Sequence, residues 1–200
     1  MVLVGFAEAS SAPEVVWSLV DNGYDVVAFA RRGQSSALHH SRHVVCHEIC
    51  APESDVETAL SDLRSLMCSL KGDHPILFPL DDTAVWLCNK LHPVDRWRLA
   101  GPQGPRAELA LNKCVQTTIA LKAGFNVPHT MLARTSEDLI AFCKAHPFPV
   151  ILKQAECVWT NRNRIENCRT ALIPRVKRFV TCIFDMSDIS KYPKLITQYV

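Results

Sequence analysis

Apolar runs and amphipathic stretches alternate through the first ninety residues of the chain. The apolar runs have the length and composition of β-strands and lie at residues 2–5, 25–30, 44–49 and 75–80. Between them, apolar side chains recur at helical spacing in residues 12–22, 54–70 and 83–91. Strands that alternate with helices predict a parallel sheet covered by helices, so we expect an α/β fold in this part of the chain.

Helix start signals support these assignments. Ser11 with Glu14, and Ser54 with Glu57, have the spacing of a capping box, in which a hydroxyl and a carboxylate satisfy the first backbone amides of a helix. Gly23 follows the first of these helices and favours its end there.

The pattern changes between residues 91 and 109. The run 101–105 (GPQGP) is typical of a linker, and it predicts a boundary that separates residues 1–104 from residues 105–200. Beyond it we expect helices at 111–123 and 135–145, the second capped by the run 135–138, and strands at 150–153 and 194–200.

Composition and charge exclude several classes of partner. The chain is 48% hydrophobic and 21% charged with a net charge of +2, as in an ordinary soluble globular protein. We expect no nucleic acid partner, because the net charge gives no general attraction to phosphate. We expect no membrane partner, because no apolar run approaches the ~18 residues of a membrane span. Nine cysteines without a Cys-x-x-Cys pair, and no secretory signal, predict reduced thiols in a cytoplasmic protein.

Polar residues follow several of the predicted strands. Ligands of open α/β sheets bind beyond the carboxyl ends of the strands, where residues 5–10, Arg31, Asp81 and Asp82 are expected. The two aspartates are candidate substrate or metal contacts, and capping of the helix that follows them is the alternative. No Gly-x-Gly-x-x-Gly follows the first strand, so no NAD or FAD site is expected.

Histidines and cysteines crowd between residues 39 and 50. Their spacing does not give the paired ligands of a zinc site, and Cys46 and His47 would point to opposite faces of a strand, so we predict no metal site. Ser41 and His43 stand at the entry to the strand 44–49, and we interpret them as part of a loop near the substrate cleft.

A more specific pattern lies between residues 111 and 153. Lys113 opens a helix, the run 120–130 (ALKAGFNVPHT) follows, and the run 148–153 (FPVILK) is an apolar strand that ends in lysine. In this order and at these separations, these features resemble the nucleotide-binding core of the ATP-grasp superfamily. The run 78–82 (FPLDD) and the alternating first half look like the pre-ATP-grasp domain that precedes this core. The resemblance implies a Rossmann-like parallel sheet domain, then the first subdomain of an ATP-grasp α+β fold that stops at the hinge strand.

The resemblance also implies an ATP site. Lys113 and Lys153 would contact the phosphates, where ammonium groups act as point charges. The strand 194–200 is similar to the hinge strand of the family, so the carbonyl of Gln198 and the amide of Val200, with Tyr199 between them, would contact adenine. The alternatives are two solvated lysines and a buried edge strand.

The usual chemistry of the family gives an expected function. It is ATP-dependent activation of a carboxylate as an acyl phosphate, followed by attack of an amine or a thiol. The implied partners are ATP, small-molecule carboxylate and amine substrates, and Mg²⁺ held by residues beyond this chain. A homodimer is one possible assembly. The rival hypothesis is a nucleotide-binding or interaction module without catalysis.

Residues 154–178 depart from the family pattern. In the family, a glycine-rich loop covers the phosphates here, but this chain has seven glycines in total and none after Gly124. From 159 to 178 there are six basic residues and one acid. Their charge would replace the backbone amides of the glycine loop, or the segment is a solvated basic loop.

Overall fold

The computed structural model describes residues 1–91, 96–146, 150–166, 171–173 and 195–199. These residues form two compact units. The first unit comprises residues 1–108 and 158–166, and the second comprises residues 109–157 with the described residues after 166. The chain therefore leaves the first unit and later returns to it for a short segment. A domain boundary at residue 104 stays a prediction.

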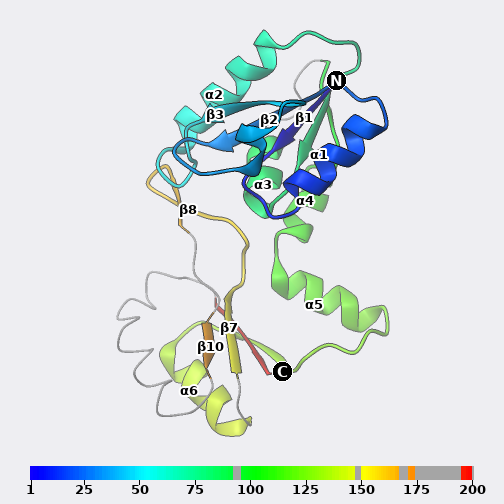
Figure 1. The fold of residues 1–200 in the computed structure, drawn as a ribbon. Helices are drawn as coiled ribbons and strands as arrows, with labels where there is room; N and C mark the ends of the chain where they lie inside the picture. Colours follow the sequence, from blue (N-terminus) through cyan, green and yellow to red (C-terminus); the bar gives the residue numbers. More distant parts are fainter. Residues whose placement is uncertain (92–95, 147–149, 167–170, 174–194, 200) are drawn as a thin grey trace. The chain divides into compact units, whose positions relative to one another are not determined.

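The first unit is built on a five-stranded sheet in which every neighbouring pair is parallel (Figure 1). Its strands are β1 (Val2–Gly5), β2 (Val26–Arg31), β3 (Val45–Ile49), β4 (Ile76–Pro79) and β5 (Arg98–Leu99). Their order is β3-β2-β1-β4-β5, which confirms the predicted α/β class and parallel sheet. The chain switches direction along the sheet between β1 and β4, and such a switch point is where open α/β sheets bind ligands.

Helices cover both faces of this sheet (Figure 1). They are α1 (Ala12–Asp21), the 3-10 helix η1 (Ala37–His40), α2 (Val56–Ser69) and α3 (Asp82–Leu91). Helix α4 (Pro105–Ala110) spans the boundary between the two units. Because side chains alternate along β1, Val4 packs with Val16 of α1, whereas Leu3 packs in a second core with Leu63 of α2. No helix in the described part of the chain has both the length and the apolar character needed to cross a membrane.

Two of the predicted capping boxes, at Ser11 and at Ser54, do not form in the structure. Ser11 precedes α1 with helical backbone angles, and its side chain caps no amide. At α2 the cap is Asp55 rather than Ser54, because Asp55 has the extended backbone of a cap residue and its carboxylate accepts from the Thr58 amide at 2.6 Å. At the third predicted start, Thr135 does form a capping box with Asp138.

The second unit holds a four-stranded sheet with the order β10-β7-β11-β6 and antiparallel neighbours. Its elements are α5 (Lys113–Lys122), β6 (Thr130–Ala133), α6 (Ser136–Ala145), β7 (Val150–Gln154), β10 (Ala171–Ile173) and β11 (Leu195–Tyr199). Helix α6 packs along β6. Leu139 and Phe142 of α6 are buried, as are Val150 and Leu152 of β7, whereas α5 has no buried side chain.

Candidate functional site

The structure separates the four residues that the sequence placed on the substrate side. Ser41 and His43 stand before β3, at its amino end, whereas Asp81 and Asp82 follow β4 at its carboxyl end. Because the strands are parallel, the amino end of β3 and the carboxyl end of β4 lie at opposite ends of the strands. These ends are separated by roughly 13 Å along a strand of this length. The structure therefore does not bring the two pairs together, and a substrate role for any of the four stays a prediction.

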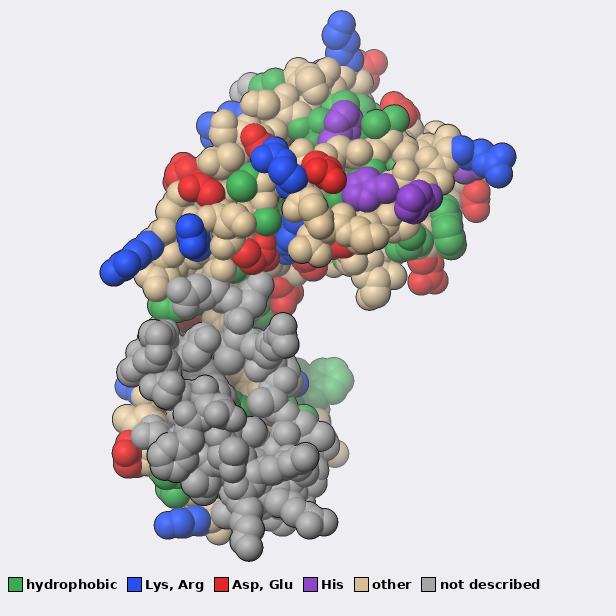
Figure 2. Space-filling model, turned by 60° about the vertical axis from the view of Figure 1, so that its left-hand side comes forward, with side chains coloured by type: hydrophobic (Ala, Val, Ile, Leu, Met, Phe, Trp, Pro, Cys, Tyr) green, Lys and Arg blue, Asp and Glu red, His purple; other side chains and the backbone are tan. Residues whose placement is uncertain are grey.

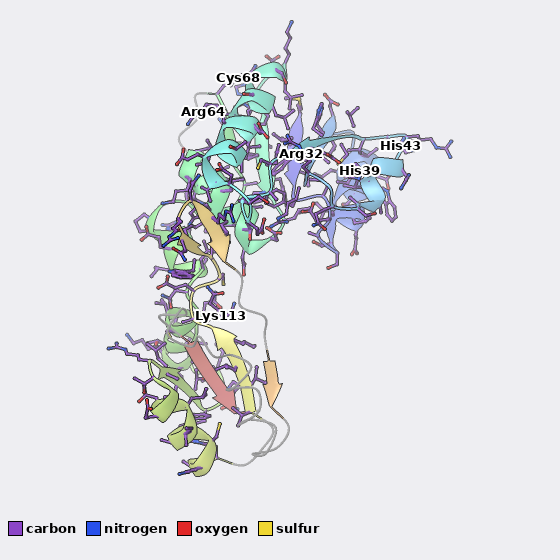
Figure 3. The ribbon with its side chains drawn as sticks, turned by 90° about the vertical axis from the view of Figure 1, so that its left-hand side faces the viewer. Arg32, His39, His43, Arg64, Cys68 and Lys113 are labelled. Carbon is purple, nitrogen blue, oxygen red and sulfur yellow. The ribbon has the colours of Figure 1, made fainter. Side chains whose placement is uncertain are left out.

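Ser41 and His43 belong to the polar surface of the first unit. The Ser41 hydroxyl accepts a hydrogen bond from the His43 amide at 3.2 Å, which shapes the turn into β3. Histidine side chains lie on this surface (Figure 2), and Figure 3 shows that His39 and His43 come from the segment between β2 and β3. Among the described residues, no group of three His, Cys, Asp or Glu side chains is arranged to hold a metal ion.

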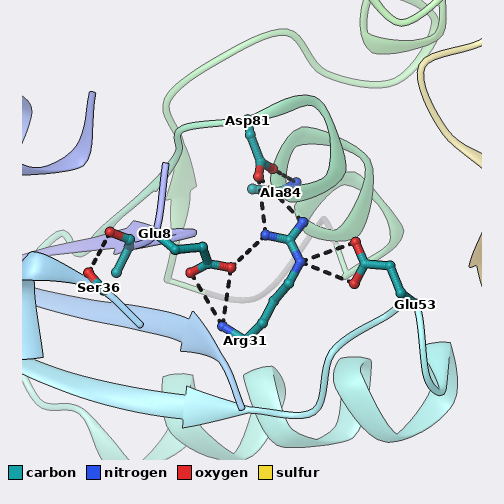
Figure 4. A network of polar contacts seen from close by, with 7 residues as sticks. Glu8, Arg31, Ser36, Glu53, Asp81 and Ala84 are labelled. Carbon is teal, nitrogen blue, oxygen red and sulfur yellow. Dashed lines mark hydrogen bonds and ion pairs between the residues drawn. The ribbon is translucent and has the colours of Figure 1, made fainter. Parts of the chain in front are cut away.

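Arg31 gathers three carboxylates at the carboxyl edge of the sheet (Figure 4). Its guanidinium lies 2.6 Å from Glu8, which follows β1, 3.1 Å from Glu53, which follows β3, and 3.3 Å from Asp81. It also lies 3.8 Å from the centre of the Phe6 ring. The Arg31 side chain is only 13% exposed. One cation therefore ties together the segments that follow four neighbouring strands, including both strands of the switch point.

The charges of this cluster are partly balanced. Burial acts to lower the pKa of Arg31, but the charge of Asp81 and the hydrogen bonds and charge of Glu8 and Glu53 outweigh it, and the pKa is raised. The guanidinium thus stays ionised against three carboxylates. Asp81 also accepts from the Ala84 amide at 2.6 Å, so it caps α3, which is the alternative that the sequence left open. Asp82 is the first residue of α3.

In the second unit, a short backbone pairing fixes the start of α5. The Lys113 amide donates to the Ala155 carbonyl at 2.8 Å, and the Cys157 amide donates to the Leu111 carbonyl at 2.8 Å. Asn112 and Glu156 face each other between these bonds as an antiparallel bridge. Segment 111–113 is therefore held against segment 155–157, which directly follows β7.

Lys113 is the first residue of α5 and is half-buried (Figure 3). Its ammonium donates to the sulfur of Cys157 at 3.0 Å. The N-terminus of a helix is the positive end of the helix dipole, so it favours an anion beside such a lysine. The Lys113 amide is bonded to Ala155, and the Val115 amide donates to the Asn112 side chain at 3.1 Å. The Cys157 contact could not be predicted from a local pattern, because the two residues are 44 positions apart.

Lys153 lies near the end of β7 and is also half-buried. Its alternating neighbours Val150 and Leu152 are buried on one face of the sheet, so Lys153 and Ile151 are on the opposite face. Both lysines predicted to contact phosphate thus belong to the second unit, on elements joined by the 111–113 and 155–157 pairing.

The predicted hinge strand corresponds to β11. It lies between β7 and β6, so it is an inner strand rather than the edge strand of the alternative interpretation. Gln198 is opposite Ile151 of β7 and Thr130 of β6. Tyr199 is opposite Val150, one residue beyond the end of the β6 register. Val200 lies outside the described residues, and the adenine contacts stay a prediction.

The glycine-free segment 154–178 contains a β-hairpin that belongs to the first unit. Its strands are β8 (Trp159–Asn161) and β9 (Arg164–Glu166), and its two turn residues, Arg162 and Asn163, have positive φ angles of 45° and 65°. Such a turn matches the twist of hairpin strands and favours asparagine or glycine at its second position. Arg162 and Arg164 are exposed, and the other basic residues of the segment lie outside the described residues.

The tip of this hairpin is bound at the start of α2. The Asn163 carbonyl accepts from the Val56 amide at 2.8 Å, and its side-chain amide donates to Asp55 at 3.1 Å. The Ile165 amide donates to the Pro52 carbonyl at 3.0 Å. The hydrogen bonds from Thr58, then that from Asn163, and the charge of Arg164 hold the pKa of Asp55 below its usual value. The hairpin therefore satisfies the Val56 amide at the start of α2.

Replacing Asn163 tests this role of the hairpin. Asn163→Val and Asn163→Gly both remove the side-chain amide, but only valine is strained at a φ of 65°. We expect the valine variant to be less stable than the glycine variant by about 1–2 kcal/mol, measured by urea denaturation. Equal stability of the two variants would show that the turn does not hold this conformation in solution.

No family model and no curated protein matches the chain in sequence, but solved structures match its fold. An L-amino acid ligase from Bacillus licheniformis has a TM-score of 0.60 and 15% identity, covering 98% of this chain and 43% of that chain. An N5-carboxyaminoimidazole ribonucleotide synthetase from Thermus thermophilus has a TM-score of 0.58 and 15% identity, and the match covers 100% of this chain and 47% of the synthetase. The biotin carboxylase domain of a Hydrogenobacter thermophilus 2-oxoglutarate carboxylase was solved with MgADP, ADP and bicarbonate. It has a TM-score of 0.57 and 17% identity, and the match covers 100% of this chain and 44% of that domain.

These matches extend over both units of the chain. They are ATP-grasp proteins, so the fold resemblance inferred from residues 111–153 is confirmed. At this level of identity the likeness shows the fold alone. The chain spans less than half the length of these structures.

Proposed function

We propose that this chain provides the N-terminal part of an ATP site and serves an ATP-dependent ligase that activates a carboxylate as an acyl phosphate for attack by an amine or a thiol. The observation that carries the proposal is the backbone pairing of residues 111–113 with 155–157. It fixes Lys113 at the start of a ten-residue helix, next to the segment that follows Lys153. Ligases and carboxylases among the fold matches support the same general chemistry.

The donors of the second unit suit a nucleoside triphosphate. Two half-buried ammonium groups, one of them at the positive end of a helix dipole, are suited to stabilise phosphate oxygens. In the proposal, Lys113 and Lys153 bind and orient the phosphates, and the backbone of β11 around Gln198 and Tyr199 contacts adenine. Magnesium, when bound with ATP, would neutralise phosphate charge. We assign it to none of the described residues, which offer no cluster suited to a metal ion.

Charge removal at the two lysines tests the ATP site. Because a hydrogen bond to a charged group contributes about 1.5–3 kcal/mol, Lys113→Gln and Lys153→Gln should each weaken ATP binding about tenfold or more. Lys122→Gln is the matched control, since Lys122 is exposed at the other end of α5 and should change affinity less than twofold. The measurement is equilibrium dialysis with labelled ATP and Mg²⁺, and urea denaturation of each variant checks that it is folded.

Two results would contradict this assignment. One is wild-type protein that binds no ATP at millimolar concentration. The other is a Lys153→Gln variant that is folded and binds ATP as tightly as the wild type.

A second candidate function is nucleotide binding without catalysis. The observation that favours it is the hairpin 159–166, which has no glycine and whose tip is engaged at the start of α2. The two functions differ in turnover. Release of ADP that depends on an added carboxylic acid, screened with a panel of carboxylates and amines, supports the ligase, and ATP binding without such release supports the module.

A further inference from the structure

The position of Lys113 depends on the pairing of segment 111–113 with segment 155–157. Helix α5 buries none of its side chains, so packing does not fix its first turn. The first amides of a helix have no partner within the helix, and the amide of Lys113 donates instead to the Ala155 carbonyl at 2.8 Å. The pairing therefore positions the lysine that we assign to phosphate.

This pairing is short and needs support from the chain on either side. Its backbone hydrogen bonds come from the amides of Lys113 and Cys157, and a pair of strands this short is marginally stable at best in water. Segment 155–157 follows β7, an inner strand of the four-stranded sheet. It leads directly into Val158, which is 8% exposed and belongs to the first unit. Val158 alone separates the pairing from β8, so the connection has no slack.

Hairpin 159–166 fastens this connection to the first unit. At its tip the Asn163 carbonyl accepts from the Val56 amide at 2.8 Å, and the Ile165 amide donates to the segment before α2 at 3.0 Å. The Ile165 side chain is 3% exposed, so the hairpin also has an apolar anchor. Arg162 has a φ of 45°, a left-handed conformation that persists where surrounding contacts impose it. The hairpin is therefore a docked element rather than a free loop.

We propose that hairpin 159–166 is a strap by which the first unit holds the nucleotide site in shape. While the strap is docked at the start of α2, it holds Cys157 beside Leu111 and so keeps Lys113 in place. When the strap leaves α2, the support on this side of the pairing is lost, the pairing opens, and Lys113 loses its fixed position. The effect on nucleotide binding rests on the proposed function, which assigns Lys113 to phosphate.

Docking and pairing are followed without ATP by hydrogen exchange of single amides, measured by NMR on the intact chain. The Val56 amide reports docking, because it is the first amide of α2 and its partner is the Asn163 carbonyl. The amides of Lys113 and Cys157 report the pairing. In the wild type all three should exchange about tenfold or more slowly than in the unfolded chain. Exchange of Val56 at the unfolded rate would overturn the proposal, because the strap would then be undocked in solution.

Slack in the connection separates docking from pairing. Insertion of Gly-Gly-Ser between Cys157 and Val158 lengthens the chain flexibly and removes no side chain. We expect the pairing to open in most molecules, so that the amides of Lys113 and Cys157 lose their protection and exchange about tenfold or more faster. The same insertion between the exposed residues Asp73 and His74, in the loop after α2, is the matched control and should leave both rates unchanged.

Two outcomes of this experiment would overturn the role of the strap. One is unchanged exchange at Lys113 and Cys157 after the insertion that follows Cys157. The other is an equal acceleration at Asp138, whose amide is bonded to Thr135 in the capping box of α6. Such an acceleration would mean that the insertion loosens the second unit as a whole and that no specific link joins the strap to the pairing.

The coupling to the nucleotide is tested by ATP affinity, measured by equilibrium dialysis. Only molecules with Lys113 in place bind ATP tightly, so an insertion that opens the pairing in most molecules should weaken binding about threefold or more. The control insertion should leave the affinity unchanged. Unchanged affinity in protein whose pairing has opened would show that the strap does not control nucleotide binding. If the wild type binds no ATP, the proposed function fails, and the exchange rates still decide whether the strap holds the pairing.

Discussion

Gly5→Ala is expected to destabilise the first unit by about 3 kcal/mol or more, because the new methyl group would overlap a buried ring. A Cβ atom at Gly5 would lie 2.2–2.4 Å from three ring carbons of Phe29. Phe29 is fully buried and packs edge-on against Phe6 with ring centroids 5.2 Å apart, so the ring has no free space to move into. Urea denaturation of the variant and the wild type measures the loss.

Two further variants isolate the cause. Gly72→Ala is the control, because its Cβ would lie 3.1 Å from the Cβ of Met1, a contact that a shift of a few tenths of an ångström relieves. We expect it to change stability by less than about 1 kcal/mol. Gly5→Ala combined with Phe29→Leu should be more stable than the sum of the two single effects predicts, since the smaller side chain removes the overlap. A Gly5→Ala variant as stable as the wild type would contradict this packing.

The elements of the first unit could be predicted because its local signals agree with its packing. The run 2–5 is a strand in the sequence pattern and in the structure, and α1 and α2 lie within the predicted helical stretches. The capping residues were predicted less well. Serine, aspartate and glutamate are all suitable near a helix start, and backbone conformation decides which of them caps, as at Asp55.

Contacts that depend on strand order could not be predicted. The partners of Arg31 are 22, 23 and 50 residues away in sequence, and they meet because β1 lies between β2 and β4. The sequence placed Arg31, Asp81 and the segment with Glu8 at the same edge of the sheet, but nothing in it indicated Glu53. The elements of Lys113 and Lys153 were predicted from the family pattern, whereas the contact of Lys113 with Cys157 follows from a backbone pairing that has no sequence signal.

Hairpin 159–166 illustrates a different limit of sequence reasoning. The lack of glycine after Gly124 indicated an unusual segment, and the structure supplies one reason for it. A turn with asparagine at 163 reaches a positive φ without glycine, and this asparagine also binds Asp55. The basic residues remain hypothetical replacements for the amides of a glycine loop, because a role in phosphate binding stays a prediction.

Arg31→Met is expected to lower the free energy of unfolding by about 3 kcal/mol, since breaking a buried ion cluster leaves charges uncompensated. The substitution keeps an apolar stem against Phe6 but removes the cation that Glu8, Glu53 and Asp81 share. The side chains of Glu53 and Asp81 are 29% and 32% exposed, so water screens part of their repulsion. We therefore expect a loss at the lower end of the about 3–5 kcal/mol that breaking a buried ion pair costs.

Arg32→Met is the matched control for the loss of a positive charge. Arg32 is the next residue, its side chain is 60% exposed, and its ion pair with Asp62 measures 3.2 Å. An exposed pair of this kind contributes about 0–1 kcal/mol, so the free energy of unfolding measured by urea denaturation should hardly change. If the carboxylates cause the loss in Arg31→Met, adding Glu8→Gln should restore part of the stability, because it removes the negative charge nearest to Arg31. A double variant that is less stable than Arg31→Met would mean that Glu8 contributes through its other contacts rather than through its charge. Recovery would instead show that Arg31 holds this edge of the sheet together by neutralising carboxylates that would otherwise repel one another.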